Sequence, residues 1–473
     1  MNATNSFRLF ILLSLVLALG LGLGSLARAQ DETPRFRAQQ AIVRLIPPAD
    51  VDAYNARHGT RVLASIPSRH LYLLQPISPE AEMALKLRLE TDSRTVWAEL
   101  NFEGRAPEGR PRNFFVSVTT DPAPYIGQYA PDLLGFGPAH RRSNGAGVVV
   151  AVVDTGVDAR HPALASRVLD SGWNFLEGNA DTADVGNGLD DDGNGYVDEM
   201  TGHGTHVAGI IAMVAPAAKI LPVKVLDSDG GGDAFFVAAG IYYAIDHGAR
   251  VINLSLSSTV LSRVVEEAVA EARRAGVVVA AAAGNLDREE PKEYPAADPR
   301  TFGVAATDAD DRKSDFSNYN ENVTISAPGT SIFSSIPEER YASWSGTSMA
   351  TPFVSGAAAL LFAQHPDWSV QQIGECLTGT ARDLNSLNPE YAGKLGAGRL
   401  DVADAVLCGL PPGALQADLN GDGAVGIAEL QTLSSHWSAT TGSVRYDRRL
   451  DLNLDGSIDL TDFAIASQEW SPP

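Results

Sequence analysis

Three polar residues in three short motifs have the types and the order needed to make a serine hydroxyl nucleophilic. Ser348 lies in Gly-Thr-Ser-Met-Ala at 346–350, Asp154 ends an apolar run, and His203 stands between two glycines in Gly-His-Gly-Thr-His. An unassisted serine attacks poorly, so a neutral histidine must take its proton and a carboxylate must hold the imidazole in the right tautomer. The three residues therefore predict acyl-transfer chemistry.

Each motif alone has a plainer interpretation. Asp-Thr-Gly after a strand is usually a turn, two histidines at i and i+3 could bind a metal, and Gly-Thr-Ser can cap a helix. Together, in the order Asp, His, Ser, the motifs resemble those of the subtilisin-like (subtilase) serine endopeptidases. The resemblance assigns the base to His203 and leaves His206 a packing or hydrogen-bonding role. An α/β-hydrolase esterase would need Gly-x-Ser-x-Gly and the order Ser, Asp, His, and neither is present.

The same resemblance identifies residues that would bind the substrate. Asn285, in Ala-Ala-Gly-Asn at 282–285, matches the subtilase asparagine that donates to the oxyanion alongside the backbone N–H of the nucleophile. The segment 251–256 resembles the strand that pairs with the substrate backbone. The family usually has Gly after Ser-Leu, whereas this chain has Ser257, which we expect to narrow or re-polarise the neighbouring pocket. The predicted substrate-binding residues are Ser255, Leu256, Ser257, Ala283 and Gly284.

The elements around these motifs predict an α/β fold for residues 113–410. Continuous apolar runs are typical of parallel strands that are covered on both faces. The expected strands are 148–153, 220–226, 251–256 and 277–283, and the expected helices are 203–214, 234–247, 261–275 and 348–362. This alternation predicts a doubly wound, mostly parallel sheet with its site at the carboxyl ends of the strands. Asp154 and Asn285 both follow such a run.

The N-terminus, residues 1–29, predicts a secretory signal peptide. Arg8 precedes an apolar run, and Ala-Arg-Ala at 27–29 offers a cleavage site. A membrane anchor is the alternative, but the run is short for a span. We therefore expect a secreted protein, extracellular or periplasmic, with no membrane anchor after removal of the signal peptide.

Residues 30–112 predict a small α+β unit with a βαββαβ-like order. It resembles the inhibitory pro-domain of subtilases, which implies a zymogen that is bound by its own pro-domain. A permanent N-terminal subdomain is the alternative. We expect the Arg- and Pro-rich stretch 104–112 to be an exposed linker where cleavage occurs.

Two C-terminal stretches fit the twelve-residue calcium loop of an EF-hand. Both have Asp or Asn at positions 1, 3 and 5, Gly at position 6, and Glu or Asp at position 12. The predicted ligands are Asp418, Asn420, Asp422, Ala424 and Glu429 in the first loop, and Asp451, Asn453, Asp455, Ser457, Asp459 and Asp462 in the second.

Residues 414–473, which contain both loops, resemble a dockerin module, a small all-α calcium-binding unit that binds cohesin domains. Many dockerins place Ser or Thr just before the final ligand, where this chain has Ile427-Ala428 and Leu460-Thr461. A cohesin-like partner and a calcium-stabilised tail without such a partner are therefore alternatives.

A third acidic stretch, 190–198, lies inside the core. Its Asp-x-Asp-x-Asn-Gly spacing also favours calcium, and similar insertions occur in subtilases just before the catalytic histidine. An acidic surface loop is the alternative. The predicted ligands are Asp190, Asp192, Asn194, Tyr196 (through its carbonyl) and Asp198.

Composition narrows the function further. The net charge of −22 argues against nucleic-acid binding, because there is no basic surplus to displace counterions.

Cys376 and Cys408 could form a disulfide or remain two buried thiols, and neither lies near a catalytic motif. The leading hypothesis is a secreted, calcium-stabilised serine endopeptidase that acts on proteins or peptides. The alternative is a catalytically silent calcium-binding scaffold.

Overall fold

The structure is a computed structural model that describes residues 34–48, 50–109, 117–409, 417–419, 424–440, 443, 446–447, 450–452 and 456–470. The expected signal peptide, residues 1–29, lies outside the described residues, as do 110–112 of the expected cleavage stretch. Within the described residues, no helix combines the length and apolar character that crossing a membrane requires.

A seven-stranded sheet forms the centre of the molecule, and every neighbouring pair in it is parallel. From one edge to the other, its strands are β13 (Val323–Pro328), β12 (Phe302–Thr307), β11 (Val278–Ala282), β10 (Val251–Leu254), β6 (Val149–Asp154), β8 (Lys219–Lys224) and β7 (Trp173–Asn174). The middle strands are rich in Val, Ile and Ala and are buried on both faces, as expected for a covered parallel sheet.

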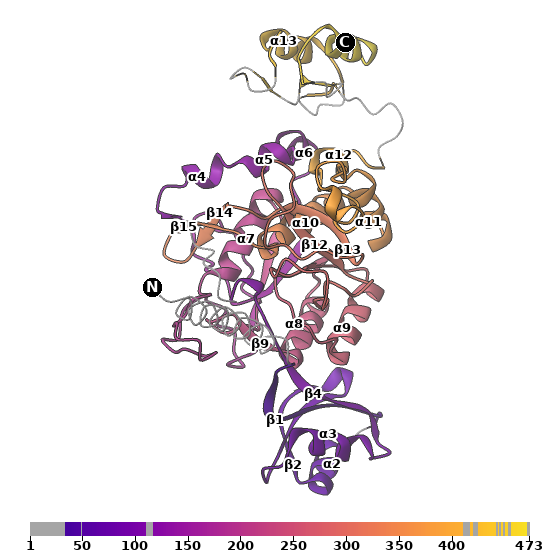
Figure 1. Ribbon diagram of the computed structural model, residues 1–473. Helices are drawn as coiled ribbons and strands as arrows, with labels where there is room; N and C mark the ends of the chain where they lie inside the picture. Colours follow the sequence, from indigo (N-terminus) through magenta and orange to yellow (C-terminus); the bar gives the residue numbers. More distant parts are fainter. Residues whose placement is uncertain are drawn as a thin grey trace, which may run out of the picture.

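Helices cover both faces of this sheet (Figure 1). α7 (His203–Val214) and α10 (Thr347–Gln364) pack together on one face, and α8 (Ala234–Asp246) and α9 (Arg263–Arg274) pack together on the other. α10 is apolar all round and almost entirely buried, and α7 carries no charged residue other than histidine. The predicted α/β fold is confirmed.

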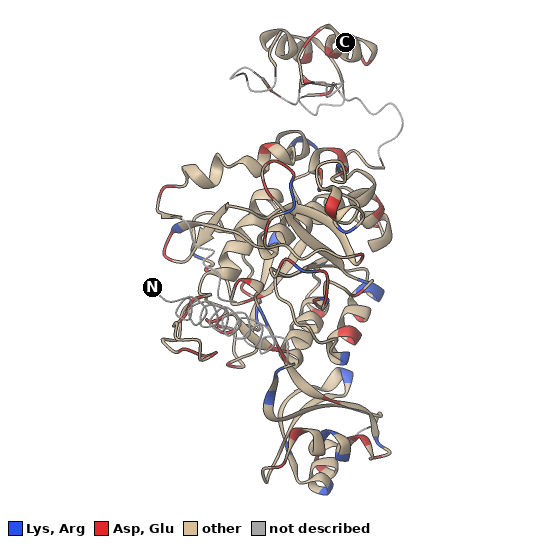
Figure 2. Cartoon of the chain, viewed as in Figure 1, with Lys and Arg blue, Asp and Glu red and all other residues tan. Residues whose placement is uncertain are grey.

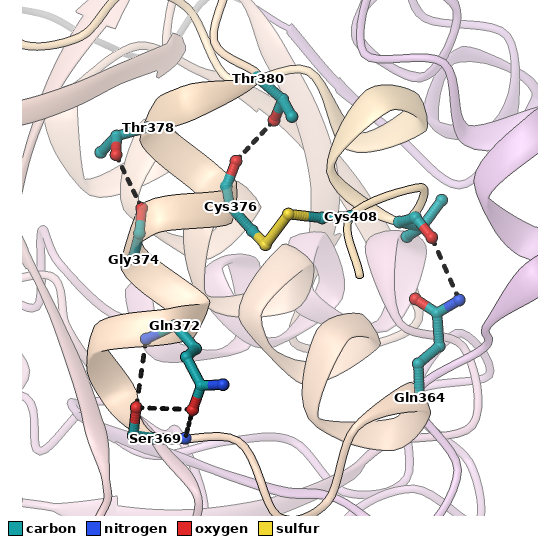
Figure 3. Close-up of a disulfide and its surroundings, with 9 residues drawn as sticks. Gln364, Ser369, Gln372, Gly374, Cys376, Thr378, Thr380 and Cys408 are labelled. Atoms are coloured by element: carbon teal, nitrogen blue, oxygen red, sulfur yellow. Dashed lines mark hydrogen bonds between the residues drawn. A yellow bond between two sulfur atoms is a disulfide. The ribbon is translucent and has the colours of Figure 1, made fainter. Parts of the chain in front are cut away.

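Cys376 and Cys408 form a disulfide, one of the two alternatives left open by the sequence. Figure 3 shows that it joins α11 (Val370–Gly379) to the segment that follows α12 (Val402–Ala405). The bridge closes a loop with a sequence separation of 32 residues, which is worth about 3–4 kcal/mol on the chain-entropy model.

The N-terminal unit is an antiparallel sheet with two helices on one face. Its elements are β1 (Phe36–Leu45), α2 (Val51–His58), β2 (Thr60–Ile66), β3 (Leu71–Pro76), α3 (Glu82–Glu90) and β4 (Thr95–Arg105). It has its own apolar cluster, which includes Tyr54, Leu74 and Leu89. These elements follow the expected βαββαβ-like order, and β2 is the strand whose side chains are mostly exposed.

This unit is attached to the central α/β domain at the starts of two of its helices. The Glu99 carboxylate accepts hydrogen bonds from the backbone N–H groups of Arg263 (2.9 Å) and Val264 (2.8 Å) at the start of α9. Asn101 Oδ1 accepts from Phe235 N at the start of α8 (3.1 Å). These contacts satisfy amides that have no partner within their own helix. Figure 2 shows acidic and basic residues interspersed along α9. One of them, Glu267, pairs with Arg44 of β1 at 2.6 Å.

Two short helices, α13 (Ile427–Ser435) and α14 (Leu460–Gln468), pack against each other in the C-terminal module. They share a small apolar cluster that includes Leu433, Leu450, Ile458 and Ala466. The central α/β domain also contains a three-stranded antiparallel sheet of β14 (Ile332–Ile336), β15 (Arg340–Trp344) and β5 (Ser117–Thr119).

Candidate active site

Asp154 is the last residue of β6 and is completely buried. Its Oδ1 accepts a hydrogen bond from Thr155 N at 2.7 Å and lies 2.7 Å from His203 Nδ1. This carboxylate therefore fixes one nitrogen of the imidazole as the proton donor and leaves Nε2 to face the other side of the site.

His203 is the first residue of α7, and the glycines on either side explain its position. Gly202 has φ of 96°, a left-handed conformation that suits glycine, and it places His203 at the entry of the helix. A Cβ at Gly204 would lie 2.1 Å from Gly156 O, so only glycine allows α7 to approach the turn after β6 this closely. The close packing of α7 against this turn therefore requires both glycines, and it brings His203 to Asp154.

His206 lies one turn further along α7 and has a different environment. It is buried, stacks on Trp344 at 5.0 Å between ring centroids, and its Nε2 lies 3.0 Å from Ala342 O. Burial lowers the pKa of His206 to about 3, so this ring is neutral. Such surroundings favour a packing role.

Ser348 lies in the first turn of α10 and is buried. Its Oγ donates to Glu108 Oε2 at 2.6 Å and lies 3.3 Å from Ser255 O. His203 Nε2 lies 3.2 Å from the same oxygen of Glu108. Ser348 and His203 therefore face one another across a single carboxylate oxygen.

Asn285 completes the cluster from the segment after β11. Its Oδ1 accepts hydrogen bonds from Thr347 N (2.9 Å) and Thr347 Oγ1 (2.8 Å), which aims its Nδ2 at the site. Nδ2 donates to the second oxygen of Glu108, Oε1, at 2.7 Å. Gly284 has φ of 101°, and a Cβ there would lie 2.4 Å from Asn318 Nδ2, so glycine is required before Asn285.

Glu108 was not predicted as a site residue, yet its carboxylate lies at the centre of this cluster. It is only 6% exposed and belongs to a short 3-10 turn, Pro107–Gly109, at the end of the N-terminal unit. Burial disfavours a charge on His203, but the carboxylates of Asp154 and Glu108 outweigh it and raise the pKa of His203 to about 10. In this arrangement the imidazole is charged and cannot accept a proton from Ser348.

The chain before Glu108 lies in a groove between two backbone segments, one at Ser257 and the other at 230–233. Arg105 and Ser257 exchange two backbone hydrogen bonds (3.0 and 2.8 Å), and Ala106 N donates to Gly230 O at 2.9 Å. On its other edge, β4 pairs antiparallel with β9 (Gly231–Asp233). The expectation of an exposed linker over 104–112 is wrong for the described part of that stretch, because the groove binds its backbone.

Among the predicted substrate-binding residues, Ser257 pairs with Arg105 in this groove, and Gly284 N donates to Thr347 Oγ1 at 3.1 Å. Ser255 Oγ donates to Ser348 O at 2.9 Å, and Leu256, Ser257 and Ala283 are buried. The effect of the Ser257 side chain on the neighbouring pocket stays a prediction.

The acidic loop before α7 brings together some of its predicted ligands and not others. Carboxylate oxygens of Asp190, Asp192 and Asp229 lie within 4.8 Å of one another. Asp198 instead accepts from the backbone of Asn187 and Gly188, and Asn194 Nδ2 bonds to Glu199. The Tyr196 side chain is exposed. Asp229 comes from the loop before β9, so the spacing within 190–198 could not reveal it.

The two C-terminal loops are described in part. Asn420, Asp422, Asn453 and Asp455 lie outside the described residues, whereas Asp418 and Ala424 are described and half-buried. The final ligand positions, Glu429 and Asp462, are buried, as is Asp451. Glu429 Oε2 accepts from Gly426 N, and its Oε1 is buried with no partner among the described residues. Asp459 caps α14 through Thr461 N, and Ser457 pairs with Thr440.

Comparisons with known proteins agree with this geometry. The model of the subtilase family matches residues 145–398, and that of the dockerin type I domain matches residues 416–469. Thermitase from Thermoactinomyces vulgaris is 41% identical over 289 residues, which cover 59% of this chain and 95% of thermitase. Subtilisin BL from Lederbergia lenta is 41% identical over 269 residues, covering 55% of this chain and 93% of that protein.

Among solved structures, fervidolysin from Fervidobacterium pennivorans, a keratinolytic enzyme related to subtilisin, shares the fold. It superimposes with a TM-score of 0.65 at 24% identity, over 80% of this chain and 62% of that one. Because the subtilase match alone spans more than half of the chain, this protein belongs to the subtilase family of serine endopeptidases and carries a C-terminal dockerin type I domain.

Proposed function

We propose that this protein is a secreted endopeptidase that cleaves peptide bonds through Ser348, His203 and Asp154, is made as an inactive precursor, and is stabilised by calcium. The observation that supports this best is the convergence of Ser348, His203 and Asn285 on one carboxylate, with Asp154 on the far side of the imidazole. Labelling with a fluorophosphonate tests the proposal, and processed protein without an adduct at Ser348 would favour the silent scaffold.

The proposed mechanism starts when Glu108 leaves and a substrate carbonyl takes its place. Ser348 Oγ attacks the carbonyl carbon while His203 Nε2 takes the hydroxyl proton, and Asp154 stabilises the imidazolium that forms. Asn285 Nδ2 and the backbone N–H of Ser348 stabilise the oxyanion. His203 then gives the proton to the leaving amine as the C–N bond breaks, and water hydrolyses the acyl-enzyme by the same route.

The groove that holds Glu103–Ala106 indicates how a substrate would bind. A substrate backbone would pair with Ser257 on one side and with β9 on the other, as this segment does. Because these contacts involve backbone atoms, they are independent of the substrate's sequence. The proposed substrates are therefore extended segments of proteins or peptides.

The N-terminal unit acts, in this proposal, as an inhibitory pro-domain that blocks the groove and the catalytic centre together. Residues 103–106 fill the backbone positions of a substrate. The chain then turns at Pro107–Gly109 and presents a side-chain carboxylate to Ser348 and Asn285. Glu108 also keeps His203 charged, so the precursor lacks both a free oxyanion donor and a general base.

Replacing Glu108 should therefore unblock the precursor. We expect Ser348 in the unprocessed Glu108→Ala and Glu108→Gln chains to react with a fluorescent fluorophosphonate about 10- to 100-fold faster than in the wild type. Charge-assisted hydrogen bonds of this kind are each worth about 1.5–3 kcal/mol, and about 1.4 kcal/mol is tenfold. The measurement is the label per mole in the unprocessed band on a gel.

Glu103→Gln is the matched control. It changes a carboxylate in the same segment that pairs with Arg37 at 3.6 Å, away from the catalytic centre. Equal labelling of the Glu108 variants, the control and the wild type would show that Glu108 does not block the site.

Clustered and buried carboxylates in the acidic loops support the proposed stabilisation by calcium. Three clustered carboxylates at Asp190, Asp192 and Asp229, and a buried Glu429 oxygen without a described partner, fit a hard cation that prefers oxygen ligands. Bound calcium would neutralise these repelling charges and hold the loops in place.

Removing calcium should lower the melting temperature. At a concentration of 100 times its Kd, a ligand adds about 2.7 kcal/mol, which corresponds to a shift of several degrees for a domain of this size. The measurement is thermal unfolding with EDTA and again after calcium is restored. Asp229→Asn should lose much of the response in the catalytic domain, whereas Asp181→Asn, in the same loop and exposed, should keep it. An unchanged melt with EDTA would contradict the calcium assignment.

The dockerin type I domain supports a further part of the proposal, that the module attaches the enzyme to a cohesin-like domain outside the cell. Ile427 and Leu460, the first residues of α13 and α14, are 64% and 71% exposed. Both stand where many dockerins carry Ser or Thr, so such a partner would need an apolar contact surface.

A further inference from the structure

Asp184 is a buried carboxylate that the proposed mechanism does not use. It lies in the loop between β7 and α7 and is 2% exposed. Burying a carboxylate is costly unless hydrogen bonds compensate for the loss of water. Its surroundings therefore indicate what the fold gains from this residue.

One oxygen of Asp184 bonds to a neighbour of each of two catalytic candidates. Oδ1 accepts from Thr155 Oγ1 at 3.1 Å and from Gly202 N at 3.0 Å. Thr155 follows Asp154 in the chain, and Gly202 precedes His203. A single oxygen thus ties the end of β6 to the start of α7.

The other oxygen holds the first turn of α7. Oδ2 accepts from Thr205 N at 3.0 Å and from Thr205 Oγ1 at 2.7 Å. Thr205 Oγ1 in turn accepts from Asp158 N at 3.0 Å, in the loop after β6. A negative group at a helix N-terminus also interacts favourably with the amides exposed there. All four donors to Asp184 therefore come from the two segments that carry Asp154 and His203.

The backbones around this carboxylate are in close contact. Val157 N donates to Thr182 O at 2.9 Å, and a Cβ at Gly156 would lie 2.7 Å from that same oxygen. Thr155 Oγ1 also accepts from Gly204 N at 3.0 Å. The loop that carries Asp184 is thus fastened to the turn after β6, which is in turn fastened to α7.

We propose that Asp184 is a positioning residue that sets the separation and orientation of Asp154 and His203 by accepting hydrogen bonds from the segments next to both. It touches neither the substrate nor the reacting atoms. Its importance follows from the sensitivity of proton transfer to geometry, since a displacement of about 1 Å can cost about 100-fold in rate. This inference rests on the proposed roles of Asp154, His203 and Ser348.

Asp184→Asn is the main test, because the amide has nearly the same shape but its NH2 group cannot accept from a backbone N–H. Either Gly202 N or Thr205 N then loses its acceptor. With a chromogenic peptide amide and processed enzyme, we expect kcat to fall about 10- to 100-fold. KM should stay within about twofold, because the groove at Ser257 and Gly230 is unchanged. Asp181→Asn should behave as the wild type, because Asp181 is exposed and accepts from Ala183 N in the same loop.

The pH profile separates positioning from a general loss of stability. A looser Asp154–His203 pair raises the pKa of the imidazole less, so the acid limb of kcat/KM should move to lower pH in Asp184→Asn. Removing the Asp184 charge would shift the limb in the same direction. Thr155→Val separates the two effects, because it keeps the Asp184 charge and removes the hydroxyl that joins Asp184 Oδ1 to Gly204 N. We expect a smaller shift of the limb to lower pH and a smaller fall in kcat.

The outcomes are distinguishable. Wild-type kcat in Asp184→Asn would overturn the inference, as would a loss of rate matched by an equal loss of sites that a fluorophosphonate can titrate. An unmoved pH limb in Thr155→Val would also overturn it, and this variant decides alone if Asp184→Asn does not fold. If the processed wild type itself takes no label at Ser348, it is the proposed function that fails.

Discussion

Ser348→Ala is expected to lower the turnover of a peptide substrate by about 10⁶-fold, a magnitude known from triad replacements in subtilisin, another member of the family. The change removes the only atom that can form the acyl-enzyme in the proposed mechanism. The same variant should accumulate with its N-terminal unit attached, if the chain cleaves itself. The measurements are the rate with a chromogenic peptide and the mass of the purified chain.

Ser345→Ala is the control for this variant. Its hydroxyl accepts from Ser331 N at 2.8 Å and takes no part in the cluster around Glu108. Turnover by Ser348→Ala near the wild-type rate would exclude Ser348 as the nucleophile. Loss of turnover with normal removal of the N-terminal unit would show that another protease performs the maturation.

Asn285→Ala should have the second largest effect, a fall in kcat of about 100- to 1000-fold with little change in KM. In the proposed mechanism Nδ2 is the side-chain donor to the oxyanion, and in this structure it donates to Glu108 at 2.7 Å. The donor acts mainly on the charge that develops in the transition state, so the loss should appear in kcat. Steady-state kinetics of the processed enzyme measure both constants.

A structural effect of the Asn285 change must be separated from the catalytic one, because Asn285 Oδ1 also accepts from Thr347 next to the nucleophile. Thermal unfolding and the number of titratable sites provide this check. Asn385→Ala, an exposed asparagine that bonds to Asp383, is the matched control. A fall in kcat of less than tenfold in a fully titratable enzyme would contradict the assignment.

Glu108 shows what local patterns could not reveal. It stands in Ala-Pro-Glu-Gly, a stretch with no motif, and in sequence it is far from Asn285 and Ser348. Pairing of β4 with β9 and of Arg105 with Ser257 brings it to the cluster of Ser348, His203 and Asn285. The expectation of an exposed linker over 104–112 failed for the same reason. Composition predicts how readily a segment is exposed to solvent, but it does not predict that another part of the chain will bind its backbone.

The acidic loop 190–198 shows that spacing within one segment cannot reveal a residue contributed by another segment. Its spacing favoured Asp198 as a ligand, but that carboxylate caps the turn at 187–188, and Asp229 takes a place beside Asp190 and Asp192. Asp184 stood in the same acidic stretch with nothing to distinguish it. Its role depends on donors from segments on either side of it in the chain.

The sequence by itself determined the family, the α/β architecture and the candidates Asp154, His203, Ser348 and Asn285. These depend on short motifs and on apolar runs whose physical meaning is local. Tertiary structure alone decided that Cys376 pairs with Cys408, that the Glu108 carboxylate contacts Ser348, and that Asp184 and Asp229 join their clusters. Each of these is a contact between distant segments, and such contacts are set by how the whole chain packs and not by the residues next to it in the sequence.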